Sequence, residues 1–212
     1  MLDLSRLPLF IIAAVSLLLI PGPAVLYIVT RSIHQGRRAG LVSMLGVHVG
    51  TAFHVAAAVF GLSAILLSSA LAFDVIKYLG AAYLVFLGIR TLMTKEQTVE
   101  ERKTEPSSLR RIFSQGVIVN VLNPKTALFF FAFLPQFVDP THGAAWLQML
   151  LLGAIFIGLG MITDGSYAML AGTFGEMLKS SKVFASIQRY VAGTIYIGLG
   201  VTTALTGSSN KS

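Results

Sequence analysis

Long apolar stretches separated by short polar segments dominate the chain. A predominantly apolar stretch of about 20 residues is long enough to cross the hydrocarbon core of a bilayer as an α-helix. The pattern contains six such stretches and therefore predicts an all-α membrane protein with six transmembrane helices. The expected helices cover residues 7–30, 40–68, 71–93, 112–138, 146–174 and 184–205.

Two of these stretches are interrupted near their middle, the first by Pro21-Gly22-Pro23 and the fourth by Asn123-Pro124-Lys125. Proline cannot donate a backbone hydrogen bond and clashes with the preceding helical turn. Inside a membrane, the backbone groups freed by such a break need partners in protein or water. Either break alone is explained by a structural kink, whereas broken helices at corresponding places in two halves indicate a transporter site.

The longest polar segment, residues 95–111, divides the helices into two groups of three. We therefore expect residues 1–94 to form one repeat, 95–111 a charged cytoplasmic linker and 112–212 a second repeat. Gly80-x-x-Tyr83 in the first half recurs as Gly193-x-x-Tyr196 in the second. Because each half has an odd number of helices, the second repeat is expected to be inverted relative to the first, as in many secondary transporters.

The composition and the distribution of charge support this topology. Hydrophobic residues make up 55% of the chain and charged residues only 12%, against about 25% charged residues in soluble domains. The net charge of +7 comes from arginines and lysines in the connections, which the positive-inside rule explains better than nucleic-acid binding does. The positive-inside rule places both termini outside. It also places the basic turn Gly36-Arg37-Arg38-Ala39-Gly40 at the cytoplasmic surface, near lipid head groups.

Lys125 and Asp164 are charged residues inside predicted helices. We expect Lys125 about 20 Å and Asp164 about 15 Å from the cytoplasmic ends of their helices, so a pair between them is geometrically possible. Lysine snorkelling to the interface and a static ion pair are the structural alternatives. Intramembrane ionisable groups are costly and mostly functional, which makes both residues candidates for substrate binding or proton coupling.

Helical phasing indicates which of these groups face other helices. Asp164 shares a face with small residues, which mark close helix packing in membranes, and so is expected to point into the protein. His54 shares a second small-residue stripe and is a candidate proton carrier, with a structural role as the alternative, while His48 lies outside that stripe. The two stripes are Gly153, Gly160, Asp164, Ala168, Ala171 and Gly175, and Gly46, Gly50, His54, Ala57 and Gly61.

Motifs of soluble enzymes are missing from the sequence. It contains no G-x-S-x-G, no H-E-x-x-H and no phosphate-binding glycine loop, so we predict neither an enzyme nor a cofactor. The absence of cysteine excludes disulfides and thiolate metal sites. Without a nucleotide-binding motif, uphill transport would have to draw on an ion gradient.

Several motifs resemble the LysE/RhtB family of bacterial amino-acid exporters over nearly the whole chain. They are Pro21-Gly22-Pro23, Gly36-Arg37-Arg38-Ala39-Gly40-Leu41, Gly80-Ala81-Ala82-Tyr83-Leu84, Asn120-x-x-Asn123-Pro124-Lys125 and Leu134-Pro135-Gln136-Phe137. The resemblance implies a six-helix protein of the bacterial inner membrane that exports amino acids or related metabolites by proton antiport. It also implies that the two breaks line the substrate path.

One departure from the family concerns the substrate. Many relatives carry an acidic or amide residue directly after the first break, where this chain has Ala24, so substrate identity does not transfer. The expected partners are an amino acid or derivative, protons and membrane lipid, and the small-residue stripes also allow a homodimer.

We expect an exporter with alternating access around the two breaks. Lys125 would hold a substrate carboxylate or neutralise Asp164, and Asp164 or His54 would exchange a proton. An ion or metal efflux permease is the first alternative, although it would favour acidic residues at the breaks. A membrane enzyme or assembly factor acting on lipids is the second, although its catalytic residues would gather at one membrane surface.

Overall fold

A computed structural model describes residues 2–3, 5–20, 22–62 and 107–179, together with isolated positions between 75 and 93 and between 190 and 201. The expected helices at 71–93 and 184–205 lie almost entirely outside the described residues, as do Pro21 and most of the linker. The described part of the chain is helical and contains no strand. This confirms the all-α prediction at the level of secondary structure.

The first predicted helix is divided in two, as the proline–glycine pattern predicts. Helix α1 covers Leu7–Leu19 and helix α2 covers Pro23–Ala57. Gly22 is extended and precedes Pro23, the first residue of α2, where a missing backbone N–H costs nothing. Because the chain is extended at Ile20 and Gly22, the carbonyls that end α1 are left to find partners from other helices.

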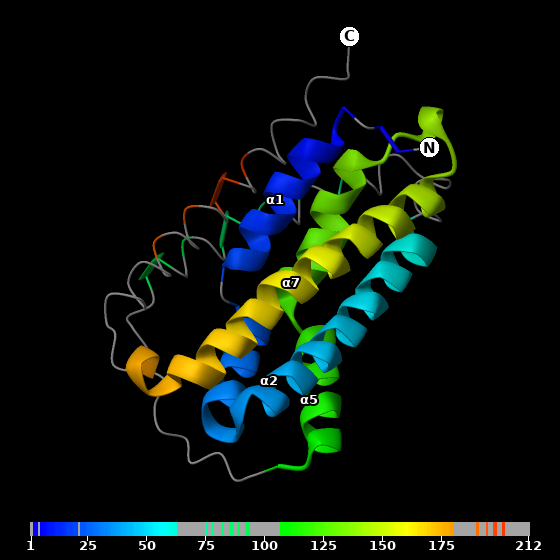
Figure 1. Ribbon diagram of the computed structural model, residues 1–212. Coiled ribbons are helices and arrows are strands. Elements are labelled where there is room, and N and C mark those ends of the chain that lie inside the picture. The colour runs from blue at the N-terminus through cyan, green and yellow to red at the C-terminus, as the bar shows by residue number, and fades with distance from the viewer. Residues whose placement is uncertain are drawn as a thin grey trace.

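A single residue turns the chain between the first and second predicted helices. Gly36 has φ 80° and ψ 175°, a left-handed conformation that glycine adopts without steric cost. Figure 1 shows α2 changing direction in this part of the ribbon. The expected five-residue turn is therefore too long, since helical structure resumes at Arg37. A short π-helix, η1 (Ala58–Leu62), continues α2.

The fourth predicted helix is also divided. Helix α5 covers Leu109–Val121 and helix α6 covers Pro124–Leu128, and the two parts of this apolar segment meet at a bend of 48°. Asn123 caps α6, since its side-chain oxygen accepts a hydrogen bond from the backbone N–H of Lys125 at 3.1 Å. The segment continues as η2 (Phe129–Phe133), η3 (Leu134–Phe137) and η4 (Pro140–His142).

Helix α7 covers Ala145–Lys179, with a distortion at Phe174 where the sequence pattern predicted its end. By length and mean hydropathy, Pro23–Gly61 and Ala145–Phe174 are long and apolar enough to cross a membrane. The bent pair Leu109–Val121 and Pro124–Phe137 adds a third span if it crosses as one unit. These spans identify a multi-pass membrane protein.

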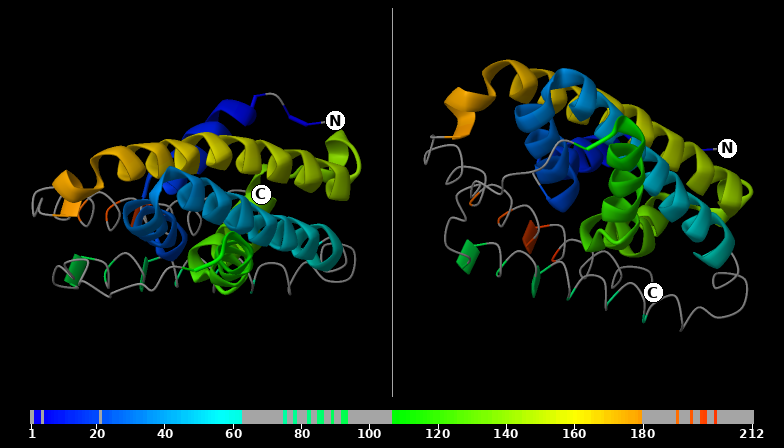
Figure 2. Two further views of the ribbon diagram at one scale, coloured as in Figure 1. Left: turned by 60° about the horizontal axis from the view of Figure 1, so that its bottom comes forward. Right: turned by 90° about the horizontal axis from the view of Figure 1, so that it is seen from below.

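Helix α2 packs against both α5 and α7 (Figure 2). Glycines permit the close approach on both sides. A Cβ atom at Gly46 would lie 2.2 Å from the Phe113 backbone oxygen of α5, and one at Gly160 of α7 would lie 2.5 Å from His48 Cε1. A side chain at Gly46 would collide with the α5 backbone and one at Gly160 with the His48 ring, so only small residues fit here, as in other interfaces of membrane helices.

Aromatic rings join α1 to the segment that follows α6. Phe10 of α1 lies edge-on to Phe137 at a centroid distance of 5.3 Å, and Phe129 lies 4.4 Å from Phe156 of α7. These rings are all almost completely buried. Buried aromatic side chains contribute a large part of packing energy, so this cluster fixes the N-terminal half of α1 beside α7.

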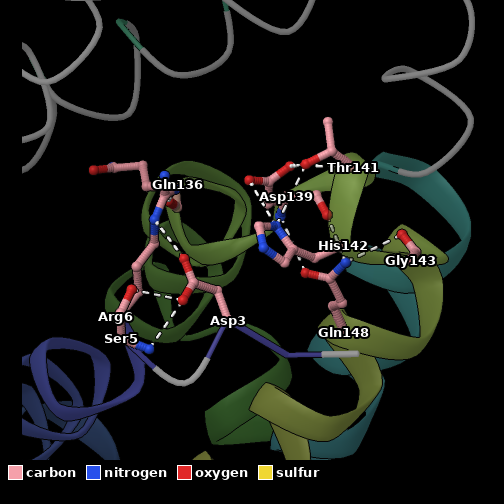
Figure 3. Close-up of polar contacts among 9 residues, drawn as sticks. All are labelled: Asp3, Ser5, Arg6, Gln136, Asp139, Thr141, His142, Gly143 and Gln148. Atoms are coloured by element: carbon pink, nitrogen blue, oxygen red, sulfur yellow. Dashed lines mark hydrogen bonds and ion pairs between the residues drawn. The ribbon is translucent and has the colours of Figure 1, made fainter.

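Polar contacts stabilise the connection between η3 and α7 (Figure 3). Gln148 of α7 accepts a hydrogen bond from the Asp139 backbone N–H at 3.0 Å and donates to the Asp139 carbonyl at 2.7 Å. Hydrogen bonds from the side chain and backbone of Thr141 lower the pKa of Asp139 to about 2. Arg6 pairs with Asp3 at 3.2 Å and donates to the Gln136 carbonyl, which ties the N-terminal segment to this connection.

Candidate functional site

Lys125 reaches across from α6 to the broken end of α1. Its ammonium donates a hydrogen bond to the Ile20 carbonyl oxygen, and the residue is only 7% exposed. The carbonyl end of a helix carries partial negative charge, so this contact balances a buried cation against a helix terminus. A Cβ atom at Gly22 would lie 3.0 Å from Lys125 Cδ, so the glycine of the first break makes room for the lysine of the second.

Tyr167 of α7 satisfies the neighbouring carbonyl. Its hydroxyl donates to the Leu19 oxygen at 2.8 Å. Lys125 and Tyr167 thus supply the partners that helix α1 loses by ending inside the protein. The end of α1 is held by side chains from two other helices rather than by its own continuation.

Asp164 of α7 pairs with His48 of α2. The distance from His48 Nε2 to Asp164 Oδ2 is 3.2 Å, and both side chains are almost fully buried. The contact lacks the alignment of a hydrogen bond, and Nδ1 of His48 and Oδ1 of Asp164 have no hydrogen-bond partner within the described residues. Unsatisfied polar atoms are expensive in a buried site, which marks this pair as a functional candidate.

Asn120 links both parts of the broken fourth helix, α5 and α6, to α2. Its amide nitrogen donates to the Val47 carbonyl at 2.9 Å and to Thr51 Oγ1 at 2.8 Å. Its side-chain oxygen accepts from Asn123 Nδ2 at 3.1 Å and from Thr126 Oγ1 at 3.0 Å. One side chain therefore holds α2, α5, the break and α6 in register.

A small cavity lies where these groups meet, between the two breaks. Its volume of about 30 Å³ is room for about two water molecules, far below the roughly 300–1,000 Å³ of typical ligand pockets. An amino acid would fit only after the surrounding helices move apart. The polar lining consists of His48, Thr51, Asn120, Asn123, Lys125, Thr126 and Asp164.

Comparison with known proteins places this geometry in a family. Residues 15–207 match the family described as LysE type translocator. The chain belongs to the LysE type translocator family. The match covers both breaks, the cavity lining and the segments outside the described residues, and it confirms the family resemblance inferred from the sequence motifs.

Several relatives cover nearly the whole of this translocator. An uncharacterized membrane protein of Vibrio cholerae is 30% identical over 92% of this chain and 94% of its own length. The membrane protein YrhP of Bacillus subtilis is 30% identical over 92% of this chain and 97% of its own. A homoserine/homoserine lactone efflux protein of Salmonella typhimurium is 29% identical over 92% and 94%. No solved structure matches this chain.

The structure brings most of the predicted site residues of this LysE type translocator together. Gly22, Asn123, Lys125 and Asp164 all line the cavity. The small-residue face of α7 is buried as expected from Gly153 to Ala171. Within the described residues, however, no ion pair joins Lys125 to Asp164. Their partners are the Ile20 carbonyl and His48 instead.

Both histidines of α2 are buried, but His48 rather than His54 lines the cavity. His54 is buried, but its Nε2 lies 2.9 Å from the Asn120 carbonyl and its ring stacks on Phe130, away from the cavity lining. His48, which the glycine stripe excluded from the packed face, is 6% exposed and lines the cavity. His48 does lie outside the glycine stripe, yet it is buried because α2 has two buried faces, and Gly46 and Gly50 mark only the one toward α5.

A signal for the second face was available in the sequence. Met44, His48, Thr51 and Val55 recur at helical spacing, and their partners toward α7 include Gly153 and Gly160, which meet Val55 and His48. Matching the glycines of one predicted helix to the larger residues of another would have identified it. Among the described residues, no group of three or more histidine, aspartate or glutamate side chains is arranged to hold a metal ion.

The Asn120 network is testable through stability. Asn120→Leu keeps the branched shape of the side chain but leaves buried partners on α2 and α6 unsatisfied, at about 1–3 kcal/mol for each polar group. We expect a clear loss of thermal stability in detergent, measured by fluorescence-detected size exclusion after heating. Ser114→Ala on α5 removes an exposed hydroxyl that bonds only to its own helix and should leave the melting temperature unchanged. Equal stability of the two variants would contradict the linking role of Asn120.

Proposed function

We propose that this translocator is a secondary exporter of amino acids or closely related small metabolites in the bacterial inner membrane, and that it exchanges its substrate for protons. The observation that carries the proposal is the polar cavity between the two helix breaks, in which buried groups of opposite charge, Lys125 and Asp164, face one space. Such a cavity suits a small molecule that carries both a cationic and an anionic or carbonyl group.

Lys125 is assigned to the oxygen end of the substrate. Its ammonium already donates to a carbonyl oxygen, that of Ile20, and a substrate carboxylate or carbonyl would take over this hydrogen bond. A charged donor forms hydrogen bonds worth about 1.5–3 kcal/mol. The exchange leaves Ile20 free to shift, which would couple substrate binding to the end of α1.

The substrate class is narrowed by the relatives. The Salmonella typhimurium relative is named for homoserine and homoserine lactone, which share an α-ammonium group and a carbonyl oxygen, whereas only homoserine has a free carboxylate. A lysine can donate to either kind of oxygen. We therefore extend the proposal to small amino acids and their lactones or similar derivatives.

The breaks supply the movement that transport requires. Transporters built from inverted repeats rock around a site formed by broken helices, and the cavity of about 30 Å³ must enlarge before it admits an amino acid. Gly22, Gly36 and the Asn123–Pro124 junction are three points where the described backbone leaves regular helix. We assign hinge motion to these points within a six-helix inverted repeat with both termini outside.

Reconstituted vesicles test the proposal. Purified protein is placed in proteoliposomes loaded with single amino acids, homoserine and homoserine lactone, and an inward proton gradient is imposed. At least one of these compounds should leave faster than from vesicles lacking the protein, and collapsing the gradient with an uncoupler should remove the difference. If no member of the panel shows gradient-driven efflux, proton-coupled amino-acid export is wrong.

A further inference from the structure

The buried pair of His48 and Asp164 differs from the other polar groups of the site in its hydrogen bonding. Asp164 Oδ1 and both ring nitrogens of His48 lack hydrogen bonds within the described residues, although the pair lies deep in the protein. Structural polar groups elsewhere at this site, such as Asn120 and His54, have their hydrogen bonds made. The unsatisfied atoms belong to residues that line the cavity, where an incoming ligand would meet them.

The residues around the His48–Asp164 pair indicate that a proton is gained or lost at the pair itself. Among the described residues that line the cavity, α1 contributes Leu17 and Leu18, α5 contributes the neutral Asn120, and α6 contributes the cation Lys125. Tyr167, on α7 with Asp164, is occupied by the Leu19 carbonyl. Among these groups, His48 is the one whose residue type serves as a proton carrier in proteins.

We propose that a proton on His48 and the ammonium group of the substrate compete for the carboxylate of Asp164, an inference that rests on the proposed export function. With the site empty of substrate, the imidazolium of His48 faces Asp164 Oδ2. A substrate ammonium binds the same carboxylate through the free Oδ1. His48 then loses its counter-charge, its N–H bond breaks, and the proton leaves to water on the side from which the substrate entered.

If the proton and the substrate ammonium cannot occupy the Asp164 carboxylate at the same time, their competition is sufficient to produce antiport. Two cations cannot share one buried carboxylate at low cost, because the second charge would be uncompensated in a poorly solvated site. Substrate binding from the cytoplasm releases a proton there, and substrate release outside lets a proton bind there. The coupling is reciprocal, so protons weaken substrate binding by the same factor as substrate weakens proton binding.

The inference also divides the substrate between two residues. Asp164 reads the ammonium group and Lys125 reads the carboxylate or carbonyl oxygen. An analogue without the amine keeps its contact with Lys125 but cannot displace the proton from His48. Homoserine and 4-hydroxybutanoate differ only in this amine and form a matched pair of probes.

The first test uses the wild-type protein in weakly buffered detergent with a pH indicator. Binding of homoserine, or of the best-carried amino acid of the vesicle panel, should release up to about one proton per molecule wherever the empty site carries the proton on His48. Binding of the corresponding acid without the amine should release none. Equal proton release by both probes, or none by the amino acid, overturns the inference.

The second test separates coupling from transport. His48→Gln should lower gradient-driven efflux in proteoliposomes at least about tenfold more than it lowers substrate-for-substrate exchange, within the range of common coupling factors. His54→Gln is the matched control, a buried α2 histidine away from the cavity lining, and should keep both activities. Gradient-driven efflux by His48→Gln at the wild-type rate overturns the inference while the export function stands.

The two failures are distinguishable by the behaviour of the wild type. If the wild-type protein carries no amino acid in either exchange or gradient-driven efflux, the proposed function itself is wrong and this inference falls with it. If His48→Gln loses exchange as well, the proton-release measurement on the wild type decides, because it needs no variant. Release that follows the amine then supports the inference, and release independent of the amine overturns it.

Discussion

Replacing Lys125 with alanine is expected to lower amino-acid export by about 10- to 150-fold. The estimate follows from losing one charge-assisted hydrogen bond to the substrate, worth about 1.5–3 kcal/mol, at about 1.4 kcal/mol per factor of ten. Lys125→Met keeps much of the apolar stem that packs beside Gly22 and should lose as much transport, since the charge carries the effect. Initial rates of efflux from proteoliposomes, normalised to inserted protein, measure both variants.

The control for this experiment lies at the same helix end. Lys125 also holds the Ile20 carbonyl, so its loss costs some stability as well as transport. Tyr167→Phe removes the equivalent hydrogen bond to the Leu19 carbonyl but does not change the cavity lining. We expect Tyr167→Phe to lose a similar amount of thermal stability and to keep export. Wild-type export by Lys125→Ala would refute the assigned site.

Gly46→Ala is expected to give the largest loss of stability for the smallest change in the sequence. The added Cβ would lie 2.2 Å from the Phe113 backbone oxygen, and a backbone atom cannot swing aside as a side chain does. Overpacking costs about 1–3 kcal/mol, occasionally more, and here it outweighs the gain of up to about 1 kcal/mol in helix propensity. Gly46→Leu should prevent accumulation of folded protein.

Gly158→Ala is the matched control for Gly46. It is also a helical glycine, but no atom of the described residues lies within 4 Å of its would-be Cβ, and the residue is exposed. Here the propensity gain acts alone, so the apparent melting temperature in detergent should stay constant or rise slightly. Export should be unaffected at Gly158 and reduced at Gly46, because the approach of α2 and α5 places Asn120 against Val47 and Thr51. Similar melting temperatures for both alanine variants would contradict the packing account.

Gly46 and Lys125 act on different parts of the same set of helix contacts around the cavity. Gly46 acts through the distance between α2 and α5, which positions the amide network of Asn120. Lys125 acts at the point where that network meets the end of α1. A variant at Gly46 that folded would therefore be expected to lose substrate affinity as well, because the cavity is lined from both sides of this interface.

Much of the fold could be read from the sequence because it depends on local chemistry. Proline and glycine interrupt helices wherever they occur in these combinations, so the breaks at Gly22 and at Asn123–Pro124 follow from the residues alone. Apolar length predicts membrane spans, and small residues at helical spacing predict the buried face that carries Asp164. The family follows from the same motifs.

The partners of the charged residues were decided only by the tertiary structure. Helical phasing assigns a direction to a side chain but does not say how many faces of the helix are covered, and α2 is buried against α5 on one side and α7 on the other. His48 therefore meets Asp164 beside Gly160, while His54 is hydrogen-bonded to the Asn120 carbonyl. Lys125 caps the free end of α1, a carbonyl 105 positions away in the sequence, because the break places that end beside α6. A sequence shows which buried groups need partners, and the packing of the helices decides which partners come within reach.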